Sequence, residues 1–169
     1  MSFIGVISSR KSFENIKNEL MRLEDNFSII HINLKSITNI KNIKFEIVII
    51  DEELKKFNNN KESLMKICNE SKYIIINSDI NKEYEKFKNC LNIVITYGLN
   101  RKATITISSI SDTDILIYKQ RMFENKNKKK EYIEERRIKI KEKNRLKVYE
   151  ILIIYTVFNI YNKDIIEEI

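Results

Sequence analysis

Proline and tryptophan are absent from this 169-residue sequence, and glycine occurs only at Gly5 and Gly98. Collagen-like chains and proline-rich linkers are therefore excluded, because both need these residues in quantity. The longest apolar run falls well short of the roughly 20 residues that cross a bilayer, so the sequence predicts no membrane span. The N-terminus lacks a charged segment followed by a long apolar stretch, which argues against a secretory signal. We therefore expect a cytoplasmic protein.

Cysteine and histidine are too few for a zinc or redox centre. Cys68 and Cys90 form no CxxC motif and have no histidine nearby, so we expect reduced, buried thiols. His31, the only histidine, lies within an apolar run and lacks the spaced partners of a zinc site or a catalytic triad. The sequence therefore predicts no cofactor and a structural role for His31.

The remaining composition is globular with a basic surplus. Hydrophobic residues make up 43% and charged residues 33%, which suits one packed core. The net charge is +7, but isoleucine, lysine and asparagine dominate together, as AT-rich codon usage would produce. The surplus is therefore a weak indication of nucleic-acid binding, and we expect no nucleic-acid partner from it alone.

Short β-branched runs predict a parallel sheet covered on both faces, because each run is apolar on both sides. Segments with helical spacing lie between them, as in a doubly wound fold. The runs are Phe3–Ile7, Ser28–Ile32, Phe45–Ile50, Tyr73–Ile76 and Asn92–Thr96. The helical stripes are Phe13, Ile16, Leu20 and Leu23; Leu64, Ile67 and Cys68; and Tyr84, Phe87 and Leu91, with Ser36–Lys44 as a loop or single turn.

The pattern changes in the second half of the chain. Three alternating segments separated by polar turns predict a small antiparallel sheet. They are Ala103–Ile110, Asp114–Lys119 and Ile133–Ile140. Between them Glu124–Lys130 is predicted as a polar, lysine-rich loop, and Leu146–Tyr161 as a helix that is apolar nearly all round and hence buried.

Together these elements predict one α/β domain over residues 1–169. It has a Rossmann-like, mostly parallel sheet of about five strands, a small antiparallel β subdomain and a buried C-terminal helix. The parallel part would span residues 1–99, the antiparallel part 100–142 and the helical C-terminus 143–169.

Two motifs in the middle of the chain occur in an informative order. "YIIINSDI" places Asn77 and Asp79 at the end of a strand, and Thr96-Tyr97-Gly98 then closes the next strand before the antiparallel segments. This order resembles the central domain of Mur ligases and folylpolyglutamate synthases, in which a strand ends in Asn-x-Asp-Asp and another in a Thr-Tyr-Gly turn. Ile80 replaces the second aspartate. The likeness covers Phe45–Ile169 and is weaker over Met1–Lys44.

The sequence differs from the family most clearly at the family's phosphate loop. Its strand runs into a Gly-rich loop ending in Gly-Lys-Thr/Ser, whereas "FIGVISSRKSFENI" keeps Lys11-Ser12 and no loop glycine. Those glycines let the backbone wrap phosphates. One interpretation is a weak anion site of Arg10, Lys11 and Ser12 at a helix N-terminus. The other is an ordinary turn in which Ser8 or Ser9 caps the helix.

Other positions that the resemblance implies are also changed. In the place of the family's magnesium-holding histidine loop stand acids that could bind a hard cation or simply favour a helix start. A family lysine has a counterpart on the following helix, and the adenine-binding asparagines are replaced. The residues concerned are Asp51, Glu52 and Glu53; Lys66; and Leu146 and Tyr149. The resemblance implies that residues 1–169 correspond to the central domain alone, so we expect no counterpart of the ligases' substrate-binding and lid domains among them.

The resemblance therefore implies a non-catalytic protein, a binding or scaffold module near cell-wall or folate-type metabolism. A protein partner or homo-oligomer is expected, with the unfinished segment Ile165–Ile169 as one candidate contact. A second hypothesis is a nucleotide or anion sensor using the degenerate phosphate loop.

A third hypothesis rests on a basic stripe near the end of the antiparallel part. Alternation would place Arg137, Lys139 and Lys141 on one face of a β-ribbon, where they could follow a phosphate backbone. The alternative is a solvated face, because glutamates dilute the stripe. The pair Glu134-Glu135 is likewise predicted to be a solvated face.

Overall fold

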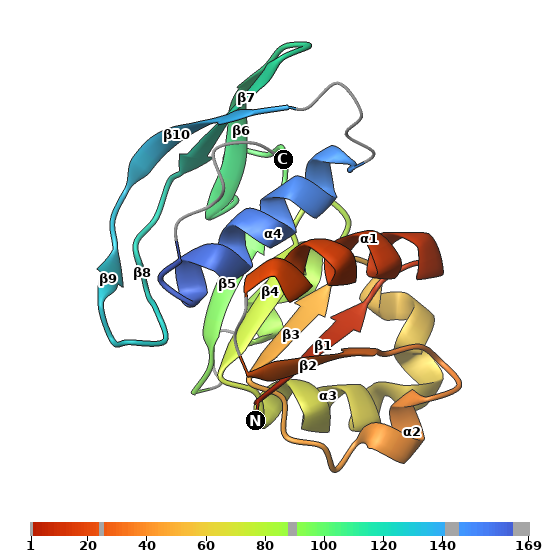
Figure 1. The fold of residues 1–169 in the computed structure, drawn as a ribbon. Helices are drawn as coiled ribbons and strands as arrows, with labels where there is room; N and C mark the ends of the chain where they lie inside the picture. The colour runs from red at the N-terminus through yellow and green to blue at the C-terminus, as the bar shows by residue number, and fades with distance from the viewer. Residues whose placement is uncertain (1, 24–25, 88–90, 141–145, 164–169) are drawn as a thin grey trace.

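One mixed sheet of eight strands organises the chain (Figure 1), in the order β10-β7-β6-β5-β4-β3-β1-β2. The computed structural model describes residues 2–23, 26–87, 91–140 and 146–163. The strands of this sheet are β1 (Ser2–Ile7), β2 (Phe27–His31), β3 (Ile47–Ile50), β4 (Tyr73–Asn77), β5 (Ile93–Tyr97), β6 (Ile105–Ile110), β7 (Asp114–Lys119) and β10 (Glu134–Lys139). The predicted α/β class with a mostly parallel sheet is confirmed.

The first five strands form the parallel part. Each of the five predicted runs coincides with one of them, and all pair in parallel as the two-sided apolar pattern requires. The order β2-β1-β3 means that the chain crosses to one side after β1 and to the other after β2. The carboxyl ends of β1 and β3 therefore flank a topological switch point, the place where open α/β sheets bind ligands.

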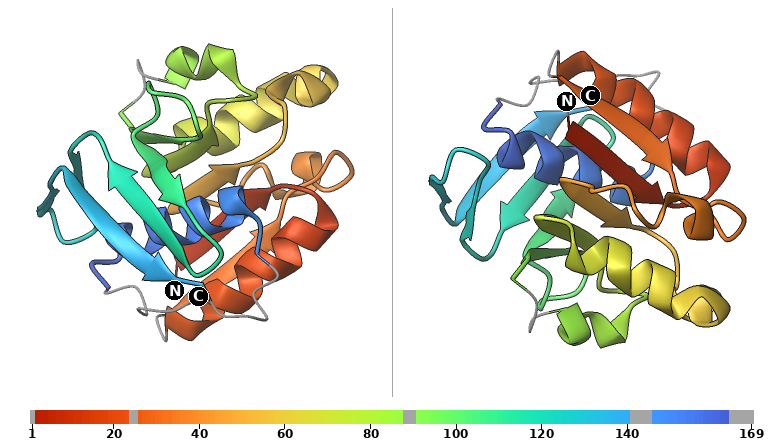
Figure 2. Two further views of the ribbon diagram at one scale, coloured as in Figure 1. Left: turned by 90° about the horizontal axis from the view of Figure 1, so that it is seen from above. Right: turned by 90° about the horizontal axis from the view of Figure 1, so that it is seen from below.

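Helices cover both faces of the parallel strands (Figure 2). One face carries α1 and α4 with one apolar cluster, and the other carries α2, α3 and the neighbouring short 3-10 helices with a second cluster. The helices are α1 (Arg10–Leu20), α2 (Ile37–Ile40), α3 (Lys61–Asn69) and α4 (Val148–Ile160), with 3-10 helices η1 (Met21–Leu23), η2 (Leu54–Asn60) and η3 (Lys82–Phe87). The predicted single turn within Ser36–Lys44 is α2.

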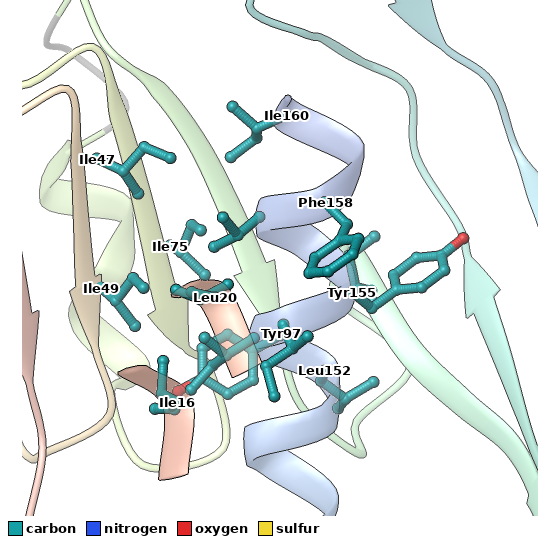
Figure 3. Close-up of a cluster of buried hydrophobic side chains, with 14 of the residues drawn as sticks. Ile16, Leu20, Ile47, Ile49, Ile75, Tyr97, Leu152, Tyr155, Phe158 and Ile160 are labelled. Carbon is teal, nitrogen blue, oxygen red and sulfur yellow. The ribbon is translucent and has the colours of Figure 1, made fainter. Parts of the chain in front are cut away.

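Helix α4 is buried along its length, as its apolar composition predicted. Every residue from Glu150 to Ile160 is buried. Figure 3 shows Leu152, Tyr155, Phe158 and Ile160 on this helix in one cluster of buried side chains with residues of α1 and the parallel strands. On its other side α4 faces the antiparallel strands, where the Tyr155 hydroxyl donates to Glu134 at 3.1 Å.

The antiparallel strands continue the main sheet. A single register pair, Tyr97 with Ile105, joins β5 to β6 in parallel; β7 and β10 then follow in antiparallel order. The prediction of a loop over Glu124–Lys130 is corrected at both ends. Glu124 belongs to strand β8 (Phe123–Glu124) and Lys130 to strand β9 (Lys130–Glu131), and the two strands pair as an antiparallel hairpin. Asn125 is fully buried in its turn, where its amide oxygen accepts the backbone N–H groups of residues 127 and 129.

The third predicted helical stripe is also corrected. In the described part of this stretch, which stops at Phe87 and resumes at Leu91, the chain forms the 3-10 helix η3. Tyr84 and Phe87 are buried three residues apart, and Leu91 is fully exposed. The spacing of two apolar residues fits one turn of a 3-10 helix as well as an α-helix, so periodicity alone could not separate them.

A lysine buried to 1% exposure holds the antiparallel part to α4. The Lys119 ammonium lies 3.1 Å from Glu131 and 2.9 Å from Glu134, and donates to Asn159 on α4 at 2.7 Å. Glu134 is therefore an ion-pair partner, which corrects its assignment to a solvated face. Burial raises the pKa of Glu134, but the hydrogen bond and charge of Lys119 outweigh it and lower that pKa below its usual range.

Several predictions concern residues outside the described ranges, namely Cys90, Lys141 and Ile165–Ile169. Cys68 is buried, as expected for a packed thiol. No helix in the described ranges is long and apolar enough to cross a membrane.

Gly5 in β1, the strand next to the edge strand β2, gives a test of the packing. A Cβ built there would lie 2.6 Å from Ile32 Cδ1 and 3.0 Å from Phe45 Cδ1. We expect Gly5→Ala to lower the free energy of unfolding by about 1–3 kcal/mol through overpacking, as measured by urea denaturation.

Ile32→Val removes the clashing Cδ1 and provides the control. The double variant Gly5→Ala/Ile32→Val should be more stable than the sum of the two single losses predicts. Strict additivity would show that the Ile32 contact does not cause the loss.

Candidate functional site

A cavity of about 370 Å³ opens at the topological switch point, outside the carboxyl ends of β1, β3 and β4. The segment before α1, the turn after β3, the end of β4 and the first turn of α4 form its walls. The lining residues are Ser9, Ser12, Asp51, Glu52, Glu53, Lys56, Asn77, Ile80, Lys147, Tyr149 and Glu150. Ser9 and Ser12 beside the first turn of α1 and Asn77 of the Asn-x-Asp motif thus line one cavity.

The turn between β1 and α1 is closed by its own side chains. Ser9 is the N-cap of α1, and its hydroxyl accepts the backbone N–H of Ser12 at 3.2 Å. Arg10 pairs with Glu14 at 2.5 Å on the exposed side of the helix, and Lys11 is exposed. Of the three residues proposed for phosphate, only Ser12 lines the cavity. The geometry of this turn is that of an ordinary helix N-cap formed by Ser9.

Ser12 is bound to a carboxylate from the other end of the chain. Its hydroxyl donates to Glu150 Oε1 at 2.6 Å, while Asn15 and the backbone N–H of Lys147 donate to Oε2 at 3.0 Å each. Glu150 is 1% exposed. A buried carboxylate with three donors is well stabilised, and the Ser12 hydroxyl is engaged by this protein anion.

Asp51, directly after β3, is the second carboxylate of the cavity. Its Oδ1 accepts the Tyr97 hydroxyl at 2.5 Å and the Asn77 amide at 3.1 Å. Burial raises the pKa of Asp51 above its usual range, more than these two hydrogen bonds lower it, and the charge of Glu150 adds to the increase. Burial and the neighbouring Asp51 also raise the pKa of Tyr97 well above normal.

Asp79 binds the turn that follows β5. It accepts the backbone N–H of Leu99 at 2.7 Å, the Asn100 amide at 2.7 Å and the Tyr149 hydroxyl at 2.9 Å. A Cβ at Gly98 would lie 2.8 Å from Asp79, so this close approach requires glycine. The two motifs of the resemblance, Asn77-x-Asp79 and Thr96-Tyr97-Gly98, are therefore in direct contact.

The hydrogen bonds of Asp79 outweigh its burial. Burial alone would raise its pKa, but the Asn100 amide, the Leu99 N–H and the Tyr149 hydroxyl together lower it below the usual range. Burial and the charge of Asp79 raise the pKa of Tyr149 to about 12. The site thus holds two aspartates whose pKa values shift in opposite directions.

The other two acids of the cavity are paired with lysines, and the candidate lysine Lys66 lies outside the cavity. Glu52 lies 3.6 Å from Lys56 and Glu53 lies 2.7 Å from Lys55, so each acid after Asp51 has its own cation. Across the described ranges no group of three or more His, Cys, Asp or Glu residues is arranged to hold a metal ion. Lys66 donates to Asn42 at 2.7 Å on the outer side of α3.

His31 has the structural role expected of it. Its Nε2 lies 2.9 Å from the carbonyl oxygen of Ser8, and its ring stacks on Phe13 with 4.7 Å between centroids. The ring therefore braces the segment that precedes α1.

The basic stripe on β10 is mixed in charge. Arg137 and Lys139 are exposed and lie two residues apart on one face. Glu135 shares that face, and the strand register sets Lys139 opposite Asp114. Glu135 near Arg137 and Asp114 opposite Lys139 reduce the attraction of these two cations for a phosphate backbone. Lys141 lies outside the described part of the chain.

Sequence reasoning missed Glu150 as the partner of Ser12, because 138 positions separate the two residues. The available signal was a lone acid in the first turn of an otherwise apolar helix, since a buried carboxylate needs partners.

Comparisons with models of known protein families and with curated proteins find no match to this chain. The likeness to the Mur-ligase central domain therefore rests on the motifs of the sequence.

The environment of Asp51 predicts a stabilising substitution. Both hydrogen bonds end on one oxygen, so an asparagine with its amide oxygen there keeps them and removes the buried charge. With a folded-state pKa above the ordinary 3.8, Asp51 contributes stability that is complete below pH 3.8 and is lost as the pH rises through the folded value. We expect Asp51→Asn to be more stable than wild type at pH 7, with the difference vanishing in acid.

Urea denaturation across this pH range measures the difference, and Asp51→Ala is the control. Alanine leaves Tyr97 and Asn77 without their acceptor and should cost about 1–3 kcal/mol at pH 7. Asp79 has the opposite pH dependence, but it is present in all three proteins and cancels in the comparison. An Asp51→Asn protein less stable than wild type at pH 7 would contradict the assigned desolvation.

Proposed function

We propose that this chain is a non-catalytic protein related in design to the Mur-ligase central domain, acting as a binding or scaffold module. The observation that carries the proposal is the hydrogen bond from Ser12 to the buried Glu150. The resemblance supplies the link to cell-wall metabolism.

Ligase chemistry requires features that this site opposes. Forming an acyl phosphate needs magnesium, a lysine and backbone donors gathered around a transferring phosphoryl group. Here the loop has no glycine, its serine binds Glu150, and Asp51 lies in the same cavity. A triphosphate placed there would meet the carboxylates of Asp51 and Glu150 as well as those of Glu52 and Glu53, which is unfavourable at low dielectric.

A protein partner or a second copy of the chain is the ligand of such a module. Exposed apolar side chains near the β8–β9 hairpin support this. Met122, Tyr132 and Ile133 are each more than half exposed, and the hairpin register brings residue 122 close to residue 132. Apolar side chains gathered on a surface favour contact with another protein.

The test is a thermal and chemical denaturation series with Mg-ATP, on wild type and Lys11→Ala, with Lys17→Ala near the other end of α1 as the matched control. We expect no stabilisation in any of the three. A ligand at about 100-fold over its dissociation constant would add roughly 2.7 kcal/mol, which such measurements resolve readily. Stabilisation that Lys11→Ala abolishes and Lys17→Ala retains would replace the proposal with a nucleotide sensor.

Glu150→Gln identifies the cause of the exclusion. It removes the charge while keeping a similar shape, so stabilisation by Mg-ATP in this variant alone would assign the exclusion of nucleotide to the carboxylate. Stabilisation of wild type that no loop substitution changes would also contradict the proposal, by placing a nucleotide site elsewhere.

A further inference from the structure

A second cavity, of about 440 Å³, lies beside the switch point on the α3 side of the sheet. Its walls are the turn after β3 with η2, the first turns of α3, and the turn after β4 with η3. It shares only Glu53 and Ile80 with the first cavity. Its size falls within the range of small-molecule sites, and it too lies outside the carboxyl ends of the strands.

The floor of this second cavity is apolar. Phe57 and Leu64 belong to the core beneath it and are 2% and 4% exposed, while Ile80 at its edge is 42% exposed. Leu54 and Met65, which pack partly buried against the same core, complete the floor. An apolar group placed on this floor would remove hydrophobic surface from water.

The rim of the cavity is basic. Lys55, Lys61, Lys82 and Lys86 stand around it, with Glu53 and Glu83 as the acids. Glu53 pairs with Lys55 at 2.7 Å, and Glu83 pairs with Lys86. Within the described residues Lys61 and Lys82 form no ion pair, although the charge of Lys61 also acts on Glu83. Four lysines against two glutamates leave the rim with a surplus of positive charge.

Asn81 holds the two sides of the cavity together. Its side chain is buried; the amide oxygen accepts the backbone N–H of Leu54 at 2.8 Å and the amide nitrogen donates to the carbonyl of Glu52 at 3.0 Å. This one side chain fixes the turn after β4 to the turn after β3. A cavity fixed in advance binds with a smaller loss of conformational entropy.

We propose that this cavity binds a small amphipathic anion, with a ring-sized apolar body on the Phe57–Leu64 floor and an anionic group at Lys61 and Lys82. A carboxylate and a phosphate monoester share the chemistry that these lysines recognise. The site is separate from the switch-point cavity, so the proposal does not depend on the function proposed above.

The first experiment is a fluorescence titration of the full chain with 8-anilinonaphthalene-1-sulfonate. We expect saturable one-to-one binding by the native protein, weakened by added salt because the lysines are exposed. The uncharged analogue N-phenyl-1-naphthylamine has the same rings without the sulfonate and should bind less tightly. Absence of saturable binding, or equal affinity for both dyes, would overturn the proposal.

Matched variants locate the bound dye. Lys61→Gln/Lys82→Gln should weaken sulfonate binding about fivefold, the loss expected for two exposed charge contacts. Lys35→Gln/Lys102→Gln changes the net charge equally at exposed positions outside the cavity and should leave the affinity unchanged. Equal weakening in both double variants would show a general charge effect and overturn the assignment.

Ile80→Asn tests the apolar floor. It should weaken both dyes, whereas the lysine pair should affect only the charged one; an unchanged affinity for both dyes would place them elsewhere. Circular dichroism checks that each variant is folded.

Competition against the bound sulfonate identifies the anionic group. 1-Naphthoate and 1-naphthyl phosphate carry the same ring system, so the stronger competitor reports whether the site prefers a carboxylate or a phosphate. Failure of both to displace the dye would overturn the proposal.

Discussion

Helix α4 is buried on all sides from Glu150 to Ile160, and α1, the parallel strands and the antiparallel strands are arranged around it. It packs against α1 and the parallel strands on one side, and the antiparallel strands extend the sheet around its other side. Each fully buried Leu, Ile or Phe of such a helix contributes roughly 1.5–3 kcal/mol relative to exposure. A five-stranded sheet with α1 alone would leave the outer side of α4 uncovered. The extension β6-β7-β10 supplies that cover, and the paired ammonium of Lys119 joins it to Asn159 of the helix.

The same helix also builds the candidate site. In its first turn Glu150 accepts the Ser12 hydroxyl and Tyr149 donates to Asp79. The packing of an apolar helix therefore positions the polar groups at the switch point. Buried carboxylates are costly unless donors surround them, and each of these acids has at least two. The stability of the core and the geometry of the site are therefore coupled through one element.

Two cavities of opposite character open at one edge of the sheet. The first contains the carboxylates of the half-buried Asp51 and the buried Glu150, which accept hydrogen bonds from the protein's own hydroxyl and amide groups. The second has an apolar floor and a rim with more lysines than glutamates. The turn after β3 separates them and contributes to both, with Asn81 fixing its position. The doubly wound topology thus leaves the usual ligand edge in place, although the side chains at the switch point itself are engaged with one another.

The sequence by itself determined the five parallel strands, the helices α1 and α3 with their apolar stripes, and the burial of α4. These features depend on local periodicity and composition. The sequence also singled out Asn77, Asp79 and the turn at Gly98. In the structure Asn77 accepts the backbone N–H of Asp79, and the Asp79 carboxylate packs against Gly98. Only the tertiary structure decided that the antiparallel strands join the main sheet, that the two ends of Glu124–Lys130 pair in a hairpin, and that Glu150 binds Ser12. Such pairings join residues far apart in the chain, and local patterns carry no information about which distant partner satisfies a buried polar group.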